Sequence, residues 1–261
     1  MKKLVVGIVC ILLALSGLTW IMVGWQEGAV AQSDDATRYE QATADDPSMS
    51  NLLKEAQQYN QTHPFNPKDG MGDQEYQKQL NKPDGIMASV DYPRLGIKLA
   101  VRHGTSEDVL SSGAGHLPGT SLPVGGKNTR TVITGHRGGT TPLFTRLGEA
   151  KEGDVFHITA AGQTIAYKVV DIRVIQPTDT QSLAPRKGED LATLLTCTPY
   201  GVNTERLAVT GVRIKMPGWT ERPVDSGILM ARGVLIGLWG IGITSMLVGI
   251  WKWKREKKVV H

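Results

Sequence analysis

Between residues 86 and 214 the chain is built of short apolar or alternating runs. The clearest of these runs are 99–101, 131–134, 155–158, 165–170, 172–175, 193–196 and 207–212. Stretches rich in glycine or proline, such as 113–119 and 123–126, separate them as turns. Many short strands with this turn punctuation are typical of a β-sandwich or a β-barrel. The pattern therefore predicts a mostly β domain and leaves open which of the two architectures it adopts.

A thiol ends one predicted strand and a guanidinium begins the next. Cys197 closes the apolar, β-branched run 193–196, and Pro199 and Gly201 then break the strand pattern. The following run, 207–212, opens directly after Arg206. If the two strands pair as a hairpin with a wide loop, both groups lie at one rim of the sheet.

Cys197 is the candidate nucleophile of the chain. A free cysteine is most often a buried core residue. The sequence has two cysteines, however, and Cys10 lies in an apolar N-terminal run, so Cys197 has neither a disulfide partner nor a second thiol for a zinc site. A lone cysteine with histidines elsewhere in the chain is a candidate nucleophile. The sequence has no nucleotide-binding glycine motif and no His-Glu-x-x-His, so we expect no cofactor and no metal.

A thiol needs a base, because only a few per cent of it is ionised at neutral pH. Among the six histidines, His136 follows the predicted strand 131–134, and His103 and His116 fall in glycine-rich turns where they could bond backbone. From position alone, His136 and His116 are equally good candidates. Arg206 is either a surface charge at a strand end or a donor to an oxyanion.

The string Thr-Leu-Leu-Thr-Cys at 193–197, with an arginine at the head of the next strand, resembles the sortase signature. The fuller string 194–207 resembles class C, the pilus-assembling branch, and the resemblance covers about residues 86–214. It implies a closed eight-stranded β-barrel. It also implies that Cys197 is the nucleophile, His136 the general acid and base, and Arg206 the stabiliser of the oxyanion, with Thr196 contacting substrate.

Residues 32–85 form a polar lead-in to this barrel. Ser48 or Ser50 can cap a helix, and a second short helix is expected over 73–80. Class C sortases carry a lid here with an Asp-Pro-aromatic motif. This chain has His63, Pro64 and Phe65 instead, so the charged tie from the lid to the arginine is missing. Phe65 is either a hydrophobic anchor or a plug over the active site.

Two apolar runs flank the predicted domain, 4–25 and 233–251. Each is long enough to span a bilayer, and all six tryptophans lie in or near them. Basic residues lie at both outer flanks, so the positive-inside rule places the tail in the cytoplasm and the domain outside. The expected divisions are a signal anchor or signal peptide over 1–31, a lead-in with the lid over 32–85, a catalytic barrel over 86–218, a juxtamembrane linker over 219–232, a transmembrane helix over 233–251 and a cytoplasmic tail over 252–261.

The net charge of +4 does not indicate nucleic acid, because the dense basic run, 252–258, directly follows an apolar segment and suits anionic lipid. The resemblance implies as partners pilins or surface proteins with a C-terminal Leu-Pro-x-Thr-Gly-like sorting signal. The enzyme would cleave it between Thr and Gly through an acyl-thioester and join the product to a pilin lysine by an isopeptide bond. The alternatives are a housekeeping sortase that attaches proteins to peptidoglycan and a non-catalytic, membrane-tethered adaptor.

Overall fold

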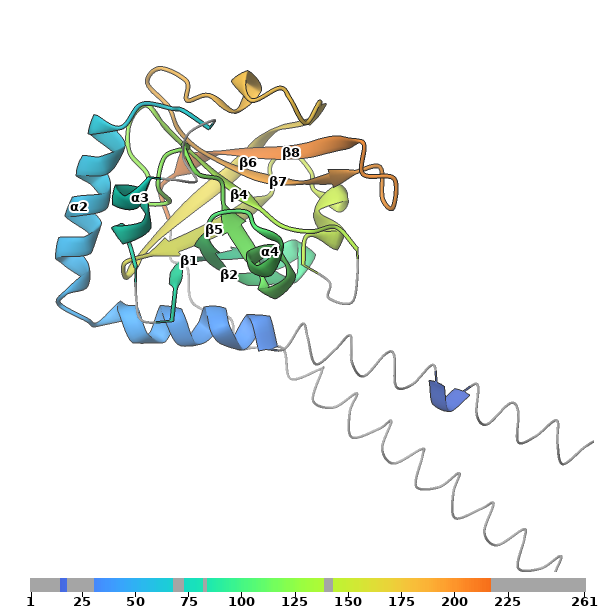
Figure 1. Cartoon of the computed structure of the whole chain (residues 1–261), viewed down its shortest axis with the longest axis horizontal. Helices are drawn as coiled ribbons and strands as arrows, with labels where there is room; N and C mark the ends of the chain where they lie inside the picture. The colour runs from blue at the N-terminus through green and yellow to red at the C-terminus, as the bar shows by residue number, and fades with distance from the viewer. Residues whose placement is uncertain (1–14, 18–30, 68–72, 82–83, 139–142, 217–261) are drawn as a thin grey trace, which may run out of the picture. The chain divides into compact units, whose positions relative to one another are not determined.

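A closed eight-stranded β-barrel forms the body of the molecule (Figure 1), as the resemblance implied. The computed structural model describes residues 15–17, 31–67, 73–81, 84–138 and 143–216. Around the barrel the strands follow the order β1-β2-β3-β4-β7-β8-β6-β5. Their bounds are β1 Ile86–Tyr92, β2 Ile97–His103, β3 Ala114–His116, β4 Thr129–Thr134, β5 Val155–Ala160, β6 Gln163–Ile175, β7 Asp190–Thr198 and β8 Glu205–Ile214. Since a closed barrel has no free edge strand, every strand is paired on both sides.

The barrel is filled by large side chains from alternating strand positions. Phe156 packs between Tyr92 and Tyr167, with ring centroids 5.8 and 5.7 Å apart. Ile133, Leu194 and other core residues of the same cluster are fully buried. Short helices join the strands: η2 Pro93–Leu95, α4 Glu107–Ser112, η3 Thr145–Glu149 and η4 Gln181–Leu183.

The strand predictions need two corrections. The runs 165–170 and 172–175 form one strand, β6, with a bulge between Val169 and Asp171 that shifts the register against β8. The segment 113–119, predicted as a turn, contains strand β3, which pairs parallel with β2 and antiparallel with β4. All three residues of β3 are buried, including His116. Burial and pairing on both sides therefore override the local turn preference of its glycines.

Helices of the lead-in lie outside the barrel, with α2 (Met49–Thr62) and α3 (Gln74–Lys78) near one another in Figure 1. Both helices were expected, and the Asp73 carboxylate caps α3 by accepting from the Glu75 amide. Residues 31–44 are also helical, which the sequence did not predict. Inside this helix, Glu40 is 6% exposed and forms an ion pair with Lys98 at 2.7 Å. The lead-in is thus docked on the barrel by buried polar contacts.

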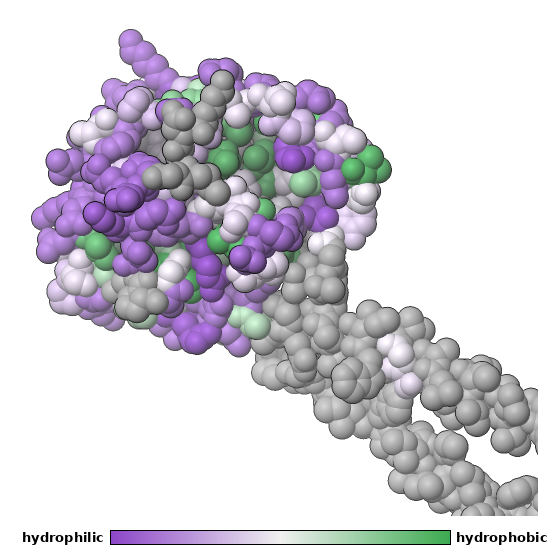
Figure 2. All heavy atoms as spheres, in the orientation of Figure 1, coloured by the Kyte–Doolittle hydropathy of each residue, from purple (hydrophilic) through white to green (hydrophobic). Residues whose placement is uncertain are grey.

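Both apolar runs predicted to span a membrane lie outside the described residues, apart from 15–17 in the first run. Among the residues that are described, no helix has the length and apolar character needed to cross a membrane. Figure 2 shows that one face of the described body carries mostly hydrophilic residues with small hydrophobic patches.

Candidate active site

The β7–β8 hairpin places Cys197 directly opposite Arg206. The two residues are Cα partners in an antiparallel register, as the strand pattern predicted. The turn between the strands bends where Gly201 and Asn203 adopt positive φ angles of 77° and 63°, values that glycine and asparagine tolerate best. Cys197 is a free, partly exposed thiol, so the fold leaves its sulfur accessible at the barrel rim.

His136 reaches the same rim because β4 runs parallel to β7. Thr134 pairs with Leu195, and the Gly135 amide donates to the Leu195 carbonyl at 3.2 Å. Position 135 must be glycine, since a Cβ there would lie 2.9 Å from a ring carbon of Phe144. His136 follows at once, with its side chain 35% exposed.

Two contacts from β7 hold the residues on either side of His136. The Thr196 hydroxyl donates to the Gly135 carbonyl at 2.7 Å, and Arg137 donates to the Thr198 hydroxyl at 3.0 Å. Thr196 and Thr198 flank the thiol residue in sequence, as Gly135 and Arg137 flank the imidazole residue. The backbone at position 136 is therefore fixed relative to Cys197.

Cys197, His136 and Arg206 line one cleft of about 340 Å³. Its other walls come from α4 and the loop before it, from the residue after β3, from the end of β6 and the segment that follows, and from η4. They include Thr105, Leu110, Leu117, Ile175, Asp179 and Leu183. Hydrogen bonds from the hydroxyl and the amide of Ser182 lower the pKa of Asp179. The cleft thus combines a thiol, an imidazole, a permanent cation and an ionised carboxylate with an apolar wall.

Thr196 lines the cleft but is only 2% exposed, and its hydroxyl is engaged with Gly135. The Thr196 side chain therefore supports the backbone of the loop that carries His136. Its predicted contact with substrate stays a prediction.

The segment 63–67 lies along the apolar wall of the cleft. Phe65 packs against a cluster of five buried residues, namely Val132, Ile175, Leu183, Leu195 and Ala208, and Pro67 lines the cleft itself. The Asn66 amide donates to the Gly119 carbonyl at 2.8 Å. His63 stacks on Tyr59 with ring centroids 3.9 Å apart, and its Nε2 lies 3.5 Å from Glu75. The imidazole of this segment is thus engaged with the lead-in helices.

The structure distinguishes His136 from His116, which position in the sequence alone did not. His116 is fully buried in β3, where its Nδ1 contacts the Tyr76 hydroxyl at 3.0 Å and its Nε2 the Ser121 carbonyl at 2.9 Å. Burial lowers its pKa to about 4. Burial also lowers the pKa of His103, whose Nε2 contacts the Gln79 carbonyl. Of these three histidines, His136 lines the cleft with the thiol.

The sequence predicted neither carboxylate of the site, Asp179 in the cleft nor Glu107 beside His136. The Glu107 carboxylate lies 3.2 Å from His136 Nε2. In the sequence Glu107 is one of two acidic residues in the stretch Thr-Ser-Glu-Asp at 105–108. Nothing in the spacing ties this stretch to His136, 29 residues after Glu107.

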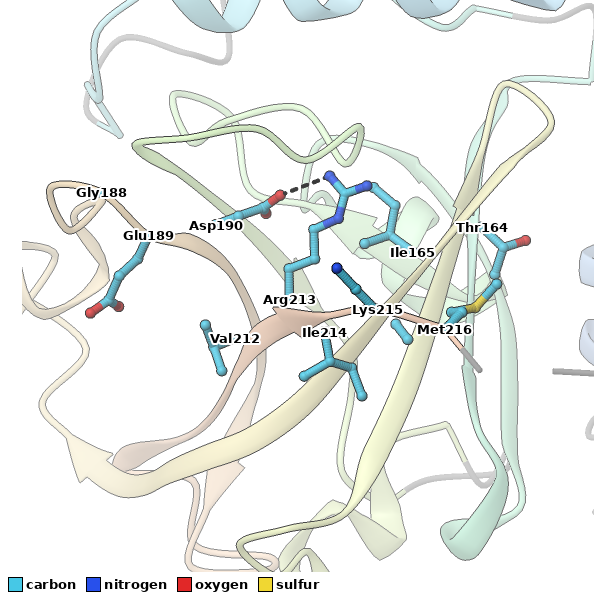
Figure 3. Close-up of a pocket in the computed structure, with 11 residues that line it drawn as sticks. Thr164, Ile165, Gly188, Glu189, Asp190, Val212, Arg213, Ile214, Lys215 and Met216 are labelled. Carbon is cyan, nitrogen blue, oxygen red and sulfur yellow. Dashed lines mark hydrogen bonds and ion pairs between the residues drawn. The ribbon is translucent and has the colours of Figure 1, made fainter. Parts of the chain in front are cut away.

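A larger cavity, of about 540 Å³, lies where the end of β8 meets the start of β6 (Figure 3). Its clearest polar feature is the ion pair between Arg213 and Asp190 at 3.2 Å. The Tyr167 hydroxyl and the Gly126 amide also donate to Asp190. The residues that line this cavity include neither a thiol nor an imidazole, so the smaller cleft is the candidate active site.

Comparisons with known proteins agree with this geometry. A family model described as a sortase domain matches residues 90–214. The crystal structure of sortase C-1 from Actinomyces oris is 40% identical and covers 66% of this chain and all of its own, with a TM-score of 0.60. The pilus-related sortase C of Group B Streptococcus is 40% identical and covers 68% of this chain and 95% of its own, with a TM-score of 0.61.

Among curated proteins, sortase D of Bacillus subtilis is 27% identical over 147 residues, which are 54% of this chain and 72% of that protein. The structural relatives share more than a third of their residues with this chain over their whole length or nearly so. The chain therefore belongs to the sortase family of cysteine transpeptidases.

Proposed function

We propose that this protein is a class C sortase that joins pilin subunits. It would recognise a Leu-Pro-x-Thr-Gly-like sorting signal, cleave it between Thr and Gly, and transfer the threonyl group to a lysine amine of the next pilin. The observation that carries the proposal is the convergence of Cys197, His136 and Arg206 on one cleft. The similarity to the pilus-related sortase C of Group B Streptococcus and the lid-like segment 63–67 support the choice of branch.

The first half-reaction follows from the three groups. The Cys197 thiolate attacks the threonine carbonyl carbon, and the carbonyl oxygen takes up the negative charge. Arg206 lies opposite Cys197, and its guanidinium keeps its charge at any working pH, so it suits stabilisation of that oxyanion. When the C–N bond to glycine breaks, His136 gives its proton to the departing amine, and a thioester remains on Cys197.

The second half-reaction reverses the proton transfer. The ε-amine of a lysine attacks the thioester carbonyl carbon and gives a proton to His136. The C–S bond then breaks, the thiolate is restored, and an isopeptide bond joins the two proteins. Each proton that His136 loses in the first half is regained in the second, so the enzyme returns to its starting state.

The segment 63–67 is proposed as a lid over the cleft. Phe65 and Pro67 occupy the apolar wall along which an extended sorting signal would run. A backbone hydrogen bond joins Asn66 to Gly119, and His63 is engaged with Tyr59 and Glu75. Because position 63 is not an aspartate, the lid lacks a charged tie to Arg206 and should open readily when substrate competes for the same wall.

Attachment to the membrane is part of the proposal and rests on the sequence. The apolar runs 4–25 and 233–251 with their basic outer flanks would anchor the chain with the barrel outside the cytoplasm. Anionic lipid would contact the tail 252–261.

The test is a transfer reaction with full-length protein and two purified substrates. One carries the sorting signal, and the other is a candidate pilin with accessible lysines. Mass-spectrometric mapping should find a Thr–Lys isopeptide crosslink that is lost with Cys197→Ala. Transfer to a peptidoglycan amine instead of lysine would replace the pilus role with cell-wall attachment, and absence of any transfer would refute the proposed activity.

A further inference from the structure

The backbone of His136 is fixed, yet backbone contacts do not fix its ring. Thr196 and Arg137 hold the two peptide neighbours of His136 against β7. The imidazole can still rotate about its side-chain bonds, and a neutral ring can carry its proton on either nitrogen. Proton transfer in both half-reactions needs one orientation and one tautomer.

Glu107, the first residue of α4, contacts the ring. Its Oε1 lies 3.2 Å from Nε2 of His136. Among the residues that the structure describes, no other carboxylate lies within ion-pair distance of this imidazole. A carboxylate accepts only, so it selects the tautomer with the proton on Nε2. Nδ1 is then left as the basic nitrogen.

The element that carries Glu107 is itself held in place. The loop before α4 and the helix itself pack closely on β3: a Cβ at Gly115 would lie 2.2 Å from the Gly104 carbonyl in the loop and 3.2 Å from a Leu110 methyl in the helix. The Gly104 amide donates to the Tyr76 hydroxyl at 3.1 Å. Thr105 and Leu110, on either side of Glu107, line the cleft. The backbone that carries Glu107 is therefore held against the barrel beside the cleft.

We propose that Glu107 is a positioning residue that fixes the tautomer and ring orientation of His136. The inference rests on the proposed function, because it assigns Glu107 a part in the proton transfers of that reaction. Asp179 and Arg206 also line the cleft, but neither has a contact with His136 among the hydrogen bonds and ion pairs of the described residues.

The first test reads the tautomer directly. Full-length protein with ¹⁵N-labelled histidine and the Cys197→Ala substitution is studied by long-range ¹H–¹⁵N NMR under alkaline conditions, where no thiolate competes for the ring. We expect His136 to carry its proton on Nε2. Glu107→Ala should convert this signal to a mixture of tautomers, and Glu107→Gln should retain it only in part, because the amide can either accept from Nε2 or donate to it. An unchanged tautomer in Glu107→Ala would overturn the proposal.

The second test reads catalysis, with Cys197 intact. Glu107 is 82% exposed, so its contact is weak and the expected loss in kcat for Glu107→Ala is about two- to fivefold with KM unchanged. Glu107→Gln should restore only part of that loss, because its amide supports either tautomer. Asp108→Ala is the matched control, since it removes an equal charge from the neighbouring, exposed position. Equal kcat in the Glu107→Ala and Asp108→Ala variants would refute the contribution of Glu107 to catalysis.

A wild-type chain without any turnover would refute the proposed function instead. The tautomer measurement does not depend on activity, and in that case it still decides whether Glu107 positions the ring.

Discussion

Replacing Thr196 with valine tests how the fold positions the imidazole. Thr196 is 2% exposed, and its hydroxyl donates to the carbonyl of Gly135, the residue before His136. Valine has nearly the same shape, so packing is retained and only the hydrogen bond is lost. Gly135 is itself buried, so water cannot readily replace the missing donor.

The expected loss of stability follows from that burial. A buried acceptor left without its donor costs about 1–2 kcal/mol, which corresponds to a fall in Tm of about 2–8 °C for a domain of this size. The loop is then free to move the ring. A displacement of about 1 Å can cost as much as a hundredfold in rate, and we expect a loss in kcat of about tenfold, because the Arg137 contact to Thr198 remains.

Thr196→Ser is the matched control. Serine keeps the hydroxyl and loses one buried methyl, which costs about 1 kcal/mol. The two variants should therefore be destabilised to a similar extent, while only Thr196→Val loses kcat. Stability is measured by thermal unfolding of the full chain, and kcat and KM by release of the glycine-containing fragment from a sorting peptide. A raised KM with unchanged kcat in Thr196→Val would mean that the hydroxyl serves substrate binding, and would refute the positioning argument.

Three further outcomes are expected. Arg206→Ala should lower the rate of acylation by about 10²–10³, the usual cost of one oxyanion donor, as stopped-flow measurement of fragment release would show; a loss below tenfold would contradict the assignment. Phe65→Ala should speed iodoacetamide labelling of the active-site thiol, and His63→Asp should slow it. Equal labelling rates in both variants and wild type would mean that segment 63–67 is only a structural anchor. Burial lowers the pKa of His116 from its ordinary 6.5 to about 4. The free energy of unfolding should therefore be highest above pH 6.5 and fall by up to about 3 kcal/mol as the pH drops towards 4, because the unfolded chain takes up the proton first. Denaturant titrations of wild type and His116→Gln across this range check it, and parallel pH profiles would contradict it.

The parts of the fold that were predictable are those in which local pattern and tertiary environment agree. The run 193–196 is apolar and β-branched, and in the structure it is the buried centre of β7. The hairpin with β8 then follows, and with it the register of Cys197 against Arg206. Pairing of β4 with β7, which brings His136 to the same rim, was not readable from the residues, and the choice of His136 over His116 came from the family resemblance.

The parts that were missed depend on contacts between residues far apart in the sequence. Strand β1, Ile86–Tyr92, is buried on both faces along most of its length, so it lacks the alternation that marks a half-exposed strand. In the helix over 31–44 a charged residue, Glu40, occupies a buried position. The apolar periodicity that predicts an amphipathic helix is therefore interrupted. Glu107 meets His136 only because α4 packs against β3.

The central claim is that Cys197 forms an acyl-enzyme with a sorting signal, and intact-protein mass spectrometry tests it most directly. Full-length protein is mixed with a Leu-Pro-x-Thr-Gly peptide in the absence of an acceptor amine and quenched in acid. We expect that the protein gains the mass of the peptide up to threonine, that fragmentation places this mass on Cys197, and that hydroxylamine removes it. A protein of unchanged mass, or an adduct that persists in Cys197→Ala, would show that Cys197 is not the nucleophile.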